Sequence, residues 1–195
     1  MLDTHARHIV QPFIKRTAIS LLNLGFTANQ VTWIAFIIGI STGIFIYLNY
    51  LVIAVILLWI SGFLDAVDGS MAREQKNATA WGTVMDITFD RIVELSVIIG
   101  LAIAFPEAHF VLLLLTASIV FSMTVFLTVG ALSEKKGIKS FYYQAGLAER
   151  TEGFILFSLM ILLNNWLIWI TLLFFILEMI TALQRLLEAR KILKD

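Results

Sequence analysis

Cysteine is absent from the sequence, and both proline and charged residues are scarce. Without cysteine the chain can form no disulfide, no thiolate nucleophile and no cysteine-ligated metal site. Two prolines and eleven glycines leave little room for disordered linkers. Charged residues make up 14% of the chain, whereas soluble domains typically carry about 25%. Because 59% of the residues are hydrophobic and the mean hydropathy is +0.90, we predict an integral membrane protein.

Long apolar stretches divide the chain into candidate transmembrane helices, each of which needs about 20 apolar residues. Six stretches qualify: 30–49, 51–71, 82–105, 109–132, 152–165 and 166–188. The fifth is short in its apolar core, and we expect it to begin near Arg150. Short turns read NYL, PEAH and NNW, as in a bundle of antiparallel helices. The predicted fold is therefore all-α, a bundle of six transmembrane helices over 30–188, within a single domain that covers 1–195.

Basic residues lie on one side of this predicted bundle. Thirteen of the fourteen Lys and Arg fall in the N-terminal stretch, the connections 73–80 and 133–150, or the C-terminal end. The fourteenth, Arg91, lies near the same side of the third span. By the positive-inside rule that side is cytoplasmic, so both termini are predicted to face the cytoplasm. No cleaved signal peptide is expected, because residues 1–20 mix basic and apolar side chains.

Residues 3–24 are predicted to form an amphipathic helix in the cytoplasmic membrane interface. They carry too many charges for a span, although a ragged extension of the first transmembrane helix is the alternative. The segment TANQ that follows is typical of a helix start. Thr27 is the expected N-cap, and Gln30 stands at the third helical position of a capping box.

Four aspartates lie within the predicted second and third spans, at their cytoplasmic ends. They are Asp65, Asp68, Asp86 and Asp90. A charged aspartate near a helix centre costs roughly 2.5–3.5 kcal/mol on insertion scales, so four together need compensation. The spacings of three and four residues place each pair on one helix face. A connection of about ten residues makes the two helices an antiparallel pair, so the carboxylates are expected to face each other. Two divalent cations, Mg²⁺ or Mn²⁺, would balance their charge.

Small residues and an arginine surround these aspartates. Gly69 and Gly82 allow a bulky ligand to approach the backbone, Ala72 keeps the next turn small, and Arg73 offers a planar fork for a phosphate. Asp65 and Asp68 alone would commonly be a helix cap or an ion pair. The full pattern D-x-x-D-G-x-x-A-R-x8-G-x3-D-x3-D instead predicts a metal and diphosphate site, because paired metals clamp both oxygens of a phosphoryl displacement.

This pattern resembles the signature of the CDP-alcohol phosphotransferase family, with all eight signature positions matched. The segment FTANQVT at 26–32 is also similar, although relatives often have proline where this chain has Ala28. The resemblance implies that an acceptor hydroxyl attacks the β-phosphate of a CDP-linked donor, that CMP leaves, and that the protein is a homodimer.

The resemblance also implies residue roles. The four aspartates Asp65, Asp68, Asp86 and Asp90 become ligands of two divalent metals, and Asp90 becomes the general base. The residues implied in CDP binding are Asp68, Gly69, Ala72, Arg73, Gly82, Asn29 and Thr32.

Five basic residues are candidates for binding a phosphorylated polar acceptor: Lys135, Lys136, Lys139, Arg150 and Arg185. For the lysines, the alternative is plain topology and attraction to anionic lipid head groups. AERTEG at 148–153 and QR at 184–185 look similar to members that make phosphatidylinositol phosphate or related archaeal lipids. Those members, however, place a basic residue earlier on the fourth span, where this chain has LTVGALSE. The acceptor is therefore left open.

The function predicted from these features is phospholipid synthesis. The expected donor is CDP-diacylglycerol or an archaeal equivalent; the alternative within the enzyme class is a CDP-linked polar alcohol. Intramembrane prenyltransferases also bind diphosphates through aspartates, but they usually have two separated motifs and more helices. A divalent-metal transporter would spread polar groups through the membrane depth, and here the far halves of the helices are apolar. Membrane lipids are expected partners, and nucleic acid is not.

Overall fold

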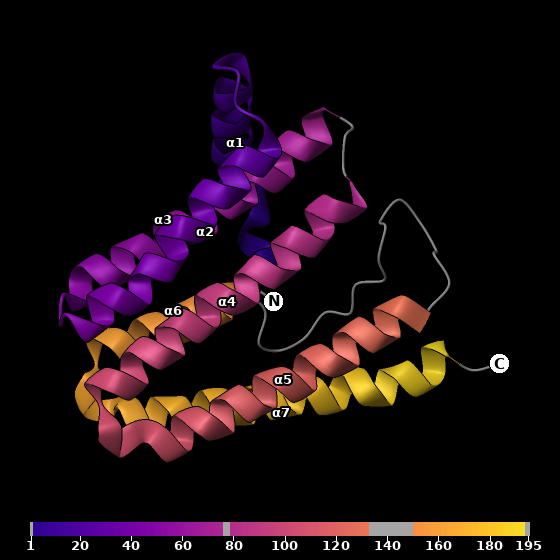
Figure 1. Ribbon diagram of the computed structural model, residues 1–195. Helices are drawn as coiled ribbons and strands as arrows, with labels where there is room; N and C mark the ends of the chain where they lie inside the picture. The colour runs from indigo at the N-terminus through magenta and orange to yellow at the C-terminus, as the bar shows by residue number, and fades with distance from the viewer. Residues whose placement is uncertain (1, 76–78, 133–149, 194–195) are drawn as a thin grey trace. The chain divides into compact units, whose positions relative to one another are not determined.

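The computed structural model describes residues 2–75, 79–132 and 150–193, and throughout them the regular structure is helical (Figure 1). The predicted all-α class is therefore confirmed. The elements are α1 (Leu2–Asn23), α2 (Ala28–Tyr47), α3 (Leu51–Glu74), α4 (Ala80–Ala104), α5 (His109–Leu132), α6 (Arg150–Leu162) and α7 (Leu167–Ile192), with short 3-10 turns at Pro106–Ala108 and Asn164–Trp166.

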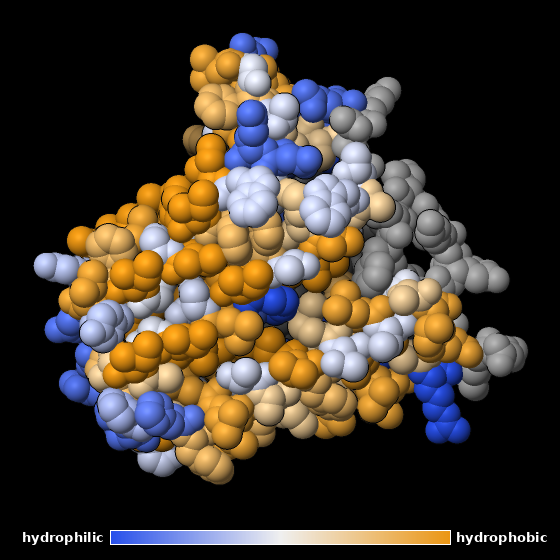
Figure 2. Space-filling model, viewed as in Figure 1, coloured by the Kyte–Doolittle hydropathy of each residue, from blue (hydrophilic) through white to orange (hydrophobic). Residues whose placement is uncertain are grey.

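Among the described residues, four helical segments are long and apolar enough to cross a membrane. They are α2, α3, Pro106–Leu132 and Asn164–Arg190, and hydrophobic side chains cover much of their visible surface (Figure 2). The protein is thus an integral membrane protein. These segments do not confirm the predicted count of six spans. The two predicted spans that are missing from this set correspond to α4, which carries several charged residues, and α6, whose described part has only 13 residues.

The helix ends follow local signals in the sequence. The Thr27 backbone N–H donates to Gln30 Oε1 over 2.9 Å, and the Gln30 N–H donates to Thr27 Oγ1 over 3.3 Å. This is the predicted capping box. Ahead of it, Gly25 has a φ of +87°, which a residue with a side chain rarely adopts. Because the chain turns here, α1 is a helix separate from α2 rather than an extension of it.

The chain forms two compact units, residues 5–106 and residues 107–195 together with 1–4, and each is described by itself. In the first unit α2 packs against both α3 and α4, and α2 and α3 lie side by side (Figure 1). α1 packs through Ala18, which is fully buried with Val31, Val67 and Met71. Lys15 on α1 also forms an ion pair of 2.9 Å with Glu74 at the end of α3. α1 therefore packs beside the stretch of α3 that carries Asp65 and Asp68.

The backbones of α2 and α4 touch at a pair of glycines. A Cβ atom added to Gly43 would lie 2.2 Å from the backbone oxygen of Ser96, and one added to Gly100 would lie 2.5 Å from the backbone oxygen of Gly43. Such distances are far inside van der Waals contact, so no side chain fits at either position. The small residues therefore set the separation of α2 and α4.

In the second unit α7 packs against α5 and α6. Val125 and Val129 of α5 form an apolar cluster with Ala189 of α7. Phe157 of α6 meets Phe174 of α7 edge to face, with 5.1 Å between the ring centroids. These contacts join α5 and α6 to the same long helix.

Candidate active site

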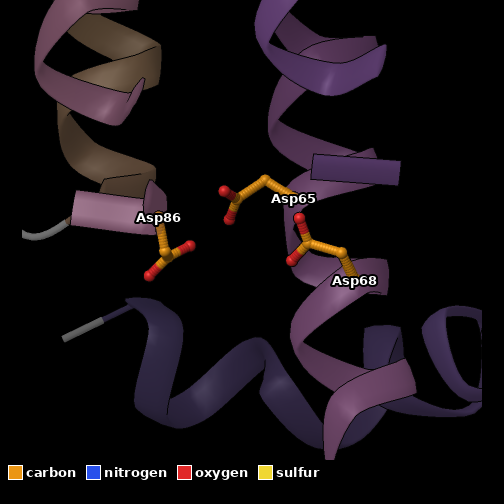
Figure 3. A group of neighbouring side chains, drawn as sticks. All are labelled: Asp65, Asp68 and Asp86. Carbon is orange, nitrogen blue, oxygen red and sulfur yellow. The ribbon is translucent and has the colours of Figure 1, made fainter. Parts of the chain in front are cut away.

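Three of the four predicted metal ligands converge between α3 and α4. Asp65 and Asp68 on α3 and Asp86 on α4 point toward one another (Figure 3), and one carboxylate oxygen from each lies within 4.8 Å of the others. Asp65 and Asp68 are 9% and 5% exposed. Several hard oxygen atoms in a confined space are the ligands that Mg²⁺ and Mn²⁺ prefer. The predicted convergence of the carboxylates is thus present for these three residues, and their role as metal ligands stays a prediction.

Asp90 does not join that three-carboxylate cluster. It lies one helical turn beyond Asp86 on α4 and lines a recess that it shares with Asp65. The other residues of the recess are Thr32, Ala35, Phe36, Ser61, Phe89 and Val93. Asp90 therefore shares the recess with Asp65 but lies outside the three-carboxylate cluster, and its part in metal binding stays a prediction.

Aromatic side chains form one wall of the recess. Phe36 of α2 and Phe89 of α4 stack with their ring centroids 4.0 Å apart, and Trp33 meets Phe89 edge to face at 4.8 Å. Such an apolar wall lowers the local dielectric beside Asp65 and Asp90, which strengthens the electrostatic interactions of these carboxylates with ligands. No sequence pattern predicted a role for these aromatic residues in the site. Phe89 could have been found as the residue next to Asp90.

Two hydroxyl groups of the recess donate to backbone carbonyl groups. Thr32 Oγ1 donates to Ala28 O over 3.0 Å, and Ser61 Oγ donates to Ala35 O over 2.8 Å. Thr32, predicted to bind CDP, thus lines the same recess as Asp65 and Asp90, one helical turn beyond Asn29 on α2. Ser61 was missed, because a serine inside an apolar helix gives no pattern by itself.

The candidates for CDP binding lie at the facing ends of three helices. The Arg73 guanidinium folds back over Gly69, since a Cβ atom at Gly69 would lie 3.4 Å from Arg73 Nη1. A Cβ atom at Gly82 would lie 3.2 Å from Thr79 Oγ1 and 4.0 Å from Asn29 Oδ1. The structure therefore brings Gly69 together with Arg73, and Gly82 together with Asn29. Ala72 is half-buried beside Arg73 on α3.

Local signals set where α4 begins. Thr79 is its N-cap, and its Oγ1 accepts a hydrogen bond of 3.0 Å from the Gly82 N–H. This cap fixes the first turn of the helix, one turn before Asp86. Further along α4, Arg91 forms an ion pair with Glu94. The positive charge of Arg91 is therefore partly balanced by a carboxylate other than the four aspartates.

Two candidates for acceptor binding lie among the described residues of the second unit. Arg150 begins α6 and is exposed, with its guanidinium carbon 5.8 Å from the centroid of the Phe154 ring. Arg185 on α7 is only 8% exposed. Its Nη1 donates to Ser122 Oγ over 3.2 Å, and its guanidinium carbon lies 5.0 Å from the Phe126 ring centroid. Lys135, Lys136 and Lys139 lie outside the described residues.

Comparison with known proteins gives consistent matches along the chain. The model of the CDP-alcohol phosphatidyltransferase family matches residues 26–177. The archaetidylinositol phosphate synthase of Pyrococcus horikoshii is 32% identical over 98% of this chain and 97% of its own length. The inner membrane protein YnjF of Escherichia coli is 30% identical over 85% of this chain and 84% of its own.

Solved structures share the fold. The phosphatidylinositol phosphate synthase of Mycobacterium tuberculosis, solved with CDP-DAG bound, has a TM-score of 0.75 over 91% of this chain and 93% of its own, at 23% identity. A second structure of that enzyme, in complex with manganese and citrate, has a TM-score of 0.74 at 23% identity.

Proposed function

The chain belongs to the CDP-alcohol phosphatidyltransferase family, and from this premise we propose its donor, its acceptor class and the roles of its residues. It is an enzyme of phospholipid biosynthesis that transfers a substituted phosphate from a CDP-linked donor to an alcohol. The proposed donor is a CDP-linked lipid, CDP-diacylglycerol or an archaeal equivalent. The observation that carries the proposal is the convergence of Asp65, Asp68 and Asp86 between α3 and α4.

The proposed cofactor is a pair of divalent ions, Mg²⁺ or Mn²⁺, held by Asp65, Asp68, Asp86 and Asp90. The donor set fits, because carboxylate oxygens from two facing helices are hard ligands at short range. Such ions neutralise the charge on the diphosphate and on the leaving CMP. The manganese in the related mycobacterial structure supports the choice of metal.

The proposed chemistry is an in-line displacement at the phosphate that carries the lipid. Asp90 accepts the proton of the acceptor hydroxyl, the oxygen of that hydroxyl bonds to phosphorus, and the phosphoanhydride bond to CMP breaks. A base for this step must lie within hydrogen-bond reach of the hydroxyl. The recess position of Asp90, beside Asp65 but outside the three-carboxylate cluster, supports the role.

The donor is proposed to lie along the facing ends of α2, α3 and α4. Arg73 binds a phosphate, while Gly69 and Gly82 leave room for the nucleotide and Ala72 keeps its turn narrow. Asn29 lies within reach of the space above Gly82, which supports its contact with CDP. Thr32 and Asp68 complete the proposed set.

The proposed acceptor is a polar alcohol that carries a phosphate. Arg150 and Arg185, with Lys135, Lys136 and Lys139, are the basic residues proposed to bind it. The names of the related synthases, which make inositol phosphate lipids, support an acceptor of this class. A CDP-linked polar alcohol as donor and a metal transporter are not favoured, because the family match accounts for the site without them.

The proposed membrane arrangement has six spans, α2 to α7, with the active site and both termini in the cytoplasm. α1 lies in the interface, with exposed apolar side chains such as Phe13 and Ile19 available to membrane lipids. The whole chain, 1–195, is proposed to work as one domain and to form a homodimer. The concentration of basic residues in segments on one side of the predicted bundle supports this orientation.

The function is tested by measuring CMP release from CDP-diacylglycerol by the purified full-length protein in Mg²⁺ or Mn²⁺. Inositol phosphate, glycerol phosphate, serine and inositol serve as acceptors. Release that requires metal and one acceptor is the expected result, and Asp68→Asn should abolish it. The matched control is Glu107→Gln, which changes an exposed carboxylate in the turn Pro106–Ala108. Metal-dependent CDP binding without CMP release would instead point to a different donor.

A further inference from the structure

Arg185 is a buried cation on the face of α7 that packs against α5. It is 8% exposed, and Thr181 and Ala189, one turn away on either side, are also buried. An arginine within an apolar bundle is costly and usually marks a functional site. We therefore expect the residues around Arg185 to orient its guanidinium for binding a ligand.

Two residues of α5 contact the guanidinium from different directions. Ser122 Oγ accepts a hydrogen bond of 3.2 Å from Nη1, and the Phe126 ring lies against the group, with 5.0 Å between the ring centroid and the guanidinium carbon. Ser122 and Phe126 are four residues apart, so they share one face of α5. A planar fork that is bound at one N–H and covered on one face has a defined orientation.

The local packing keeps α5 and α7 in register around this contact. Val125 and Val129 of α5 pack with Ala189 of α7, one turn beyond Arg185. Ser122 itself is 2% exposed, so water does not compete freely for its hydrogen bond with Arg185. The contact is thus a buried, directed one rather than a solvated surface pair.

We propose that Ser122 and Phe126 are positioning residues that orient the Arg185 guanidinium toward the phosphate of the acceptor. The inference rests on the proposed function, in which Arg185 binds a phosphorylated acceptor. Ser122 and Phe126 act only through Arg185. Their loss therefore weakens acceptor binding and leaves donor binding unchanged.

Steady-state kinetics of the full-length protein with Mn²⁺, CDP-diacylglycerol and inositol phosphate or glycerol phosphate test this inference. Ser122→Ala and Phe126→Leu are each expected to raise the acceptor KM by about three- to tenfold, with the donor KM unchanged. Phe126→Tyr, which keeps an aromatic face, should have the acceptor KM of the unmodified protein. Ser118→Ala is the matched control, because Ser118 is a buried serine one turn away on α5 that donates to Leu115 O.

A double-mutant cycle separates an action through Arg185 from general loss of packing. In an Arg185→Gln background, Ser122→Ala should change the acceptor KM by less than about twofold, because residues that act as one unit are not additive. The inference is overturned if Ser122→Ala and Phe126→Leu match Ser118→Ala, or if their effects persist undiminished in Arg185→Gln.

Failure of the underlying function has a different signature. If Arg185→Gln leaves the acceptor KM unchanged in an active enzyme, the acceptor role of Arg185 is wrong, and the inference falls with it. If the unmodified protein releases no CMP from CDP-diacylglycerol with any phosphorylated acceptor, the proposed donor or acceptor class is wrong, and the inference is rejected with it.

Discussion

Asp90 lies beside Asp65 in an aromatic-walled recess, while the other three aspartates face one another. Asp86 and Asp90, one helical turn apart on α4, thus differ in that only Asp86 belongs to the carboxylate cluster. Carboxylates that converge are suited to hold metal, and a general base needs a place at which the acceptor hydroxyl can reach it. The difference supports a division of labour between Asp90 and the cluster.

Replacing Asp90 with asparagine tests that division. Asp90→Asn is expected to lower kcat by about 10²–10⁴-fold, the usual contribution of a general base, because asparagine cannot accept the proton. Binding of the CDP-linked donor should be largely retained, as measured by calorimetry. Unchanged turnover would remove Asp90 as the base, whereas loss of donor binding would make it mainly a metal ligand.

Arg73 is the second position at which single-residue chemistry matters. Its guanidinium folds over Gly69, where a planar group can bind two phosphate oxygens at once and an ammonium group cannot. Arg73→Lys should therefore raise the donor KM about tenfold, with the acceptor KM unchanged. Arg16→Lys, an exposed arginine on α1, is the control. Equal changes in both KM values would argue against a donor contact.

At the scale of helices, the crossing of α2 and α4 limits where the aspartates can lie. The backbone oxygen of Ser96 lies where a Gly43 side chain would be, so α4 approaches α2 as closely as two backbones allow. Gly39, one turn earlier on α2, meets Val93 and Ser61 of the recess. The crossing is thus continuous with the floor of the recess beside Asp65 and Asp90.

Adding a methyl group at the crossing should separate the two helices. Gly43→Ala is expected to destabilise the protein by about 1–3 kcal/mol through overpacking, which corresponds to a fall in Tm of about 3–10 °C. Its activity should also need more Mn²⁺, because Asp86 moves with α4. Both are measured on detergent-purified protein, by thermal unfolding and by metal titration of CMP release.

Gly153 provides the matched control for this substitution. A Cβ atom there would lie 3.7 Å from Phe174 Cζ, an ordinary contact distance, and a helical alanine is favoured over glycine. Gly153→Ala should leave Tm unchanged or raise it. An equal fall in Tm for both variants would show that the α2–α4 crossing is not specially constrained.

For the whole molecule, the number of spans decides on which side each turn lies. In the described part of the chain four helical segments meet the length and apolarity of a span, whereas α4 carries charged residues of the candidate active site. If α4 also crosses, the turn at Glu107 lies on the side opposite to the active site. If it does not, that turn lies on the same side as the active site.

The absence of native cysteine makes this question accessible to labelling. Single variants Asn49→Cys, Gln75→Cys and Glu107→Cys should react with a membrane-impermeant maleimide in intact cells only at positions 49 and 107. Position 75 should react after the membrane is opened, because the active-site side is proposed to be cytoplasmic. Protection of position 107 in intact cells would contradict the six-span arrangement.

The sequence by itself determined that this protein lies in a membrane, where its helices break, and which carboxylates can meet to form a candidate metal site. Hydropathy alone separates bilayer from water, and the breaks at Asn49, Pro106 and Asn164 are local effects that need no partner. The spacing of the aspartates likewise follows from the period of the helix, so Asp65, Asp68 and Asp86 could be predicted to face one another.

Only the tertiary structure decided what lies against each functional side chain. Helical period gives the face of a residue but not the rotation and separation of two packed helices, so it did not distinguish Asp90 from Asp86. The Phe36–Phe89 stack depends on how closely α2 approaches α4. The partner of Arg185, Ser122, lies 63 residues away in the chain. Contacts of this kind arise from side-chain packing between helices, which no pattern within a single helix encodes.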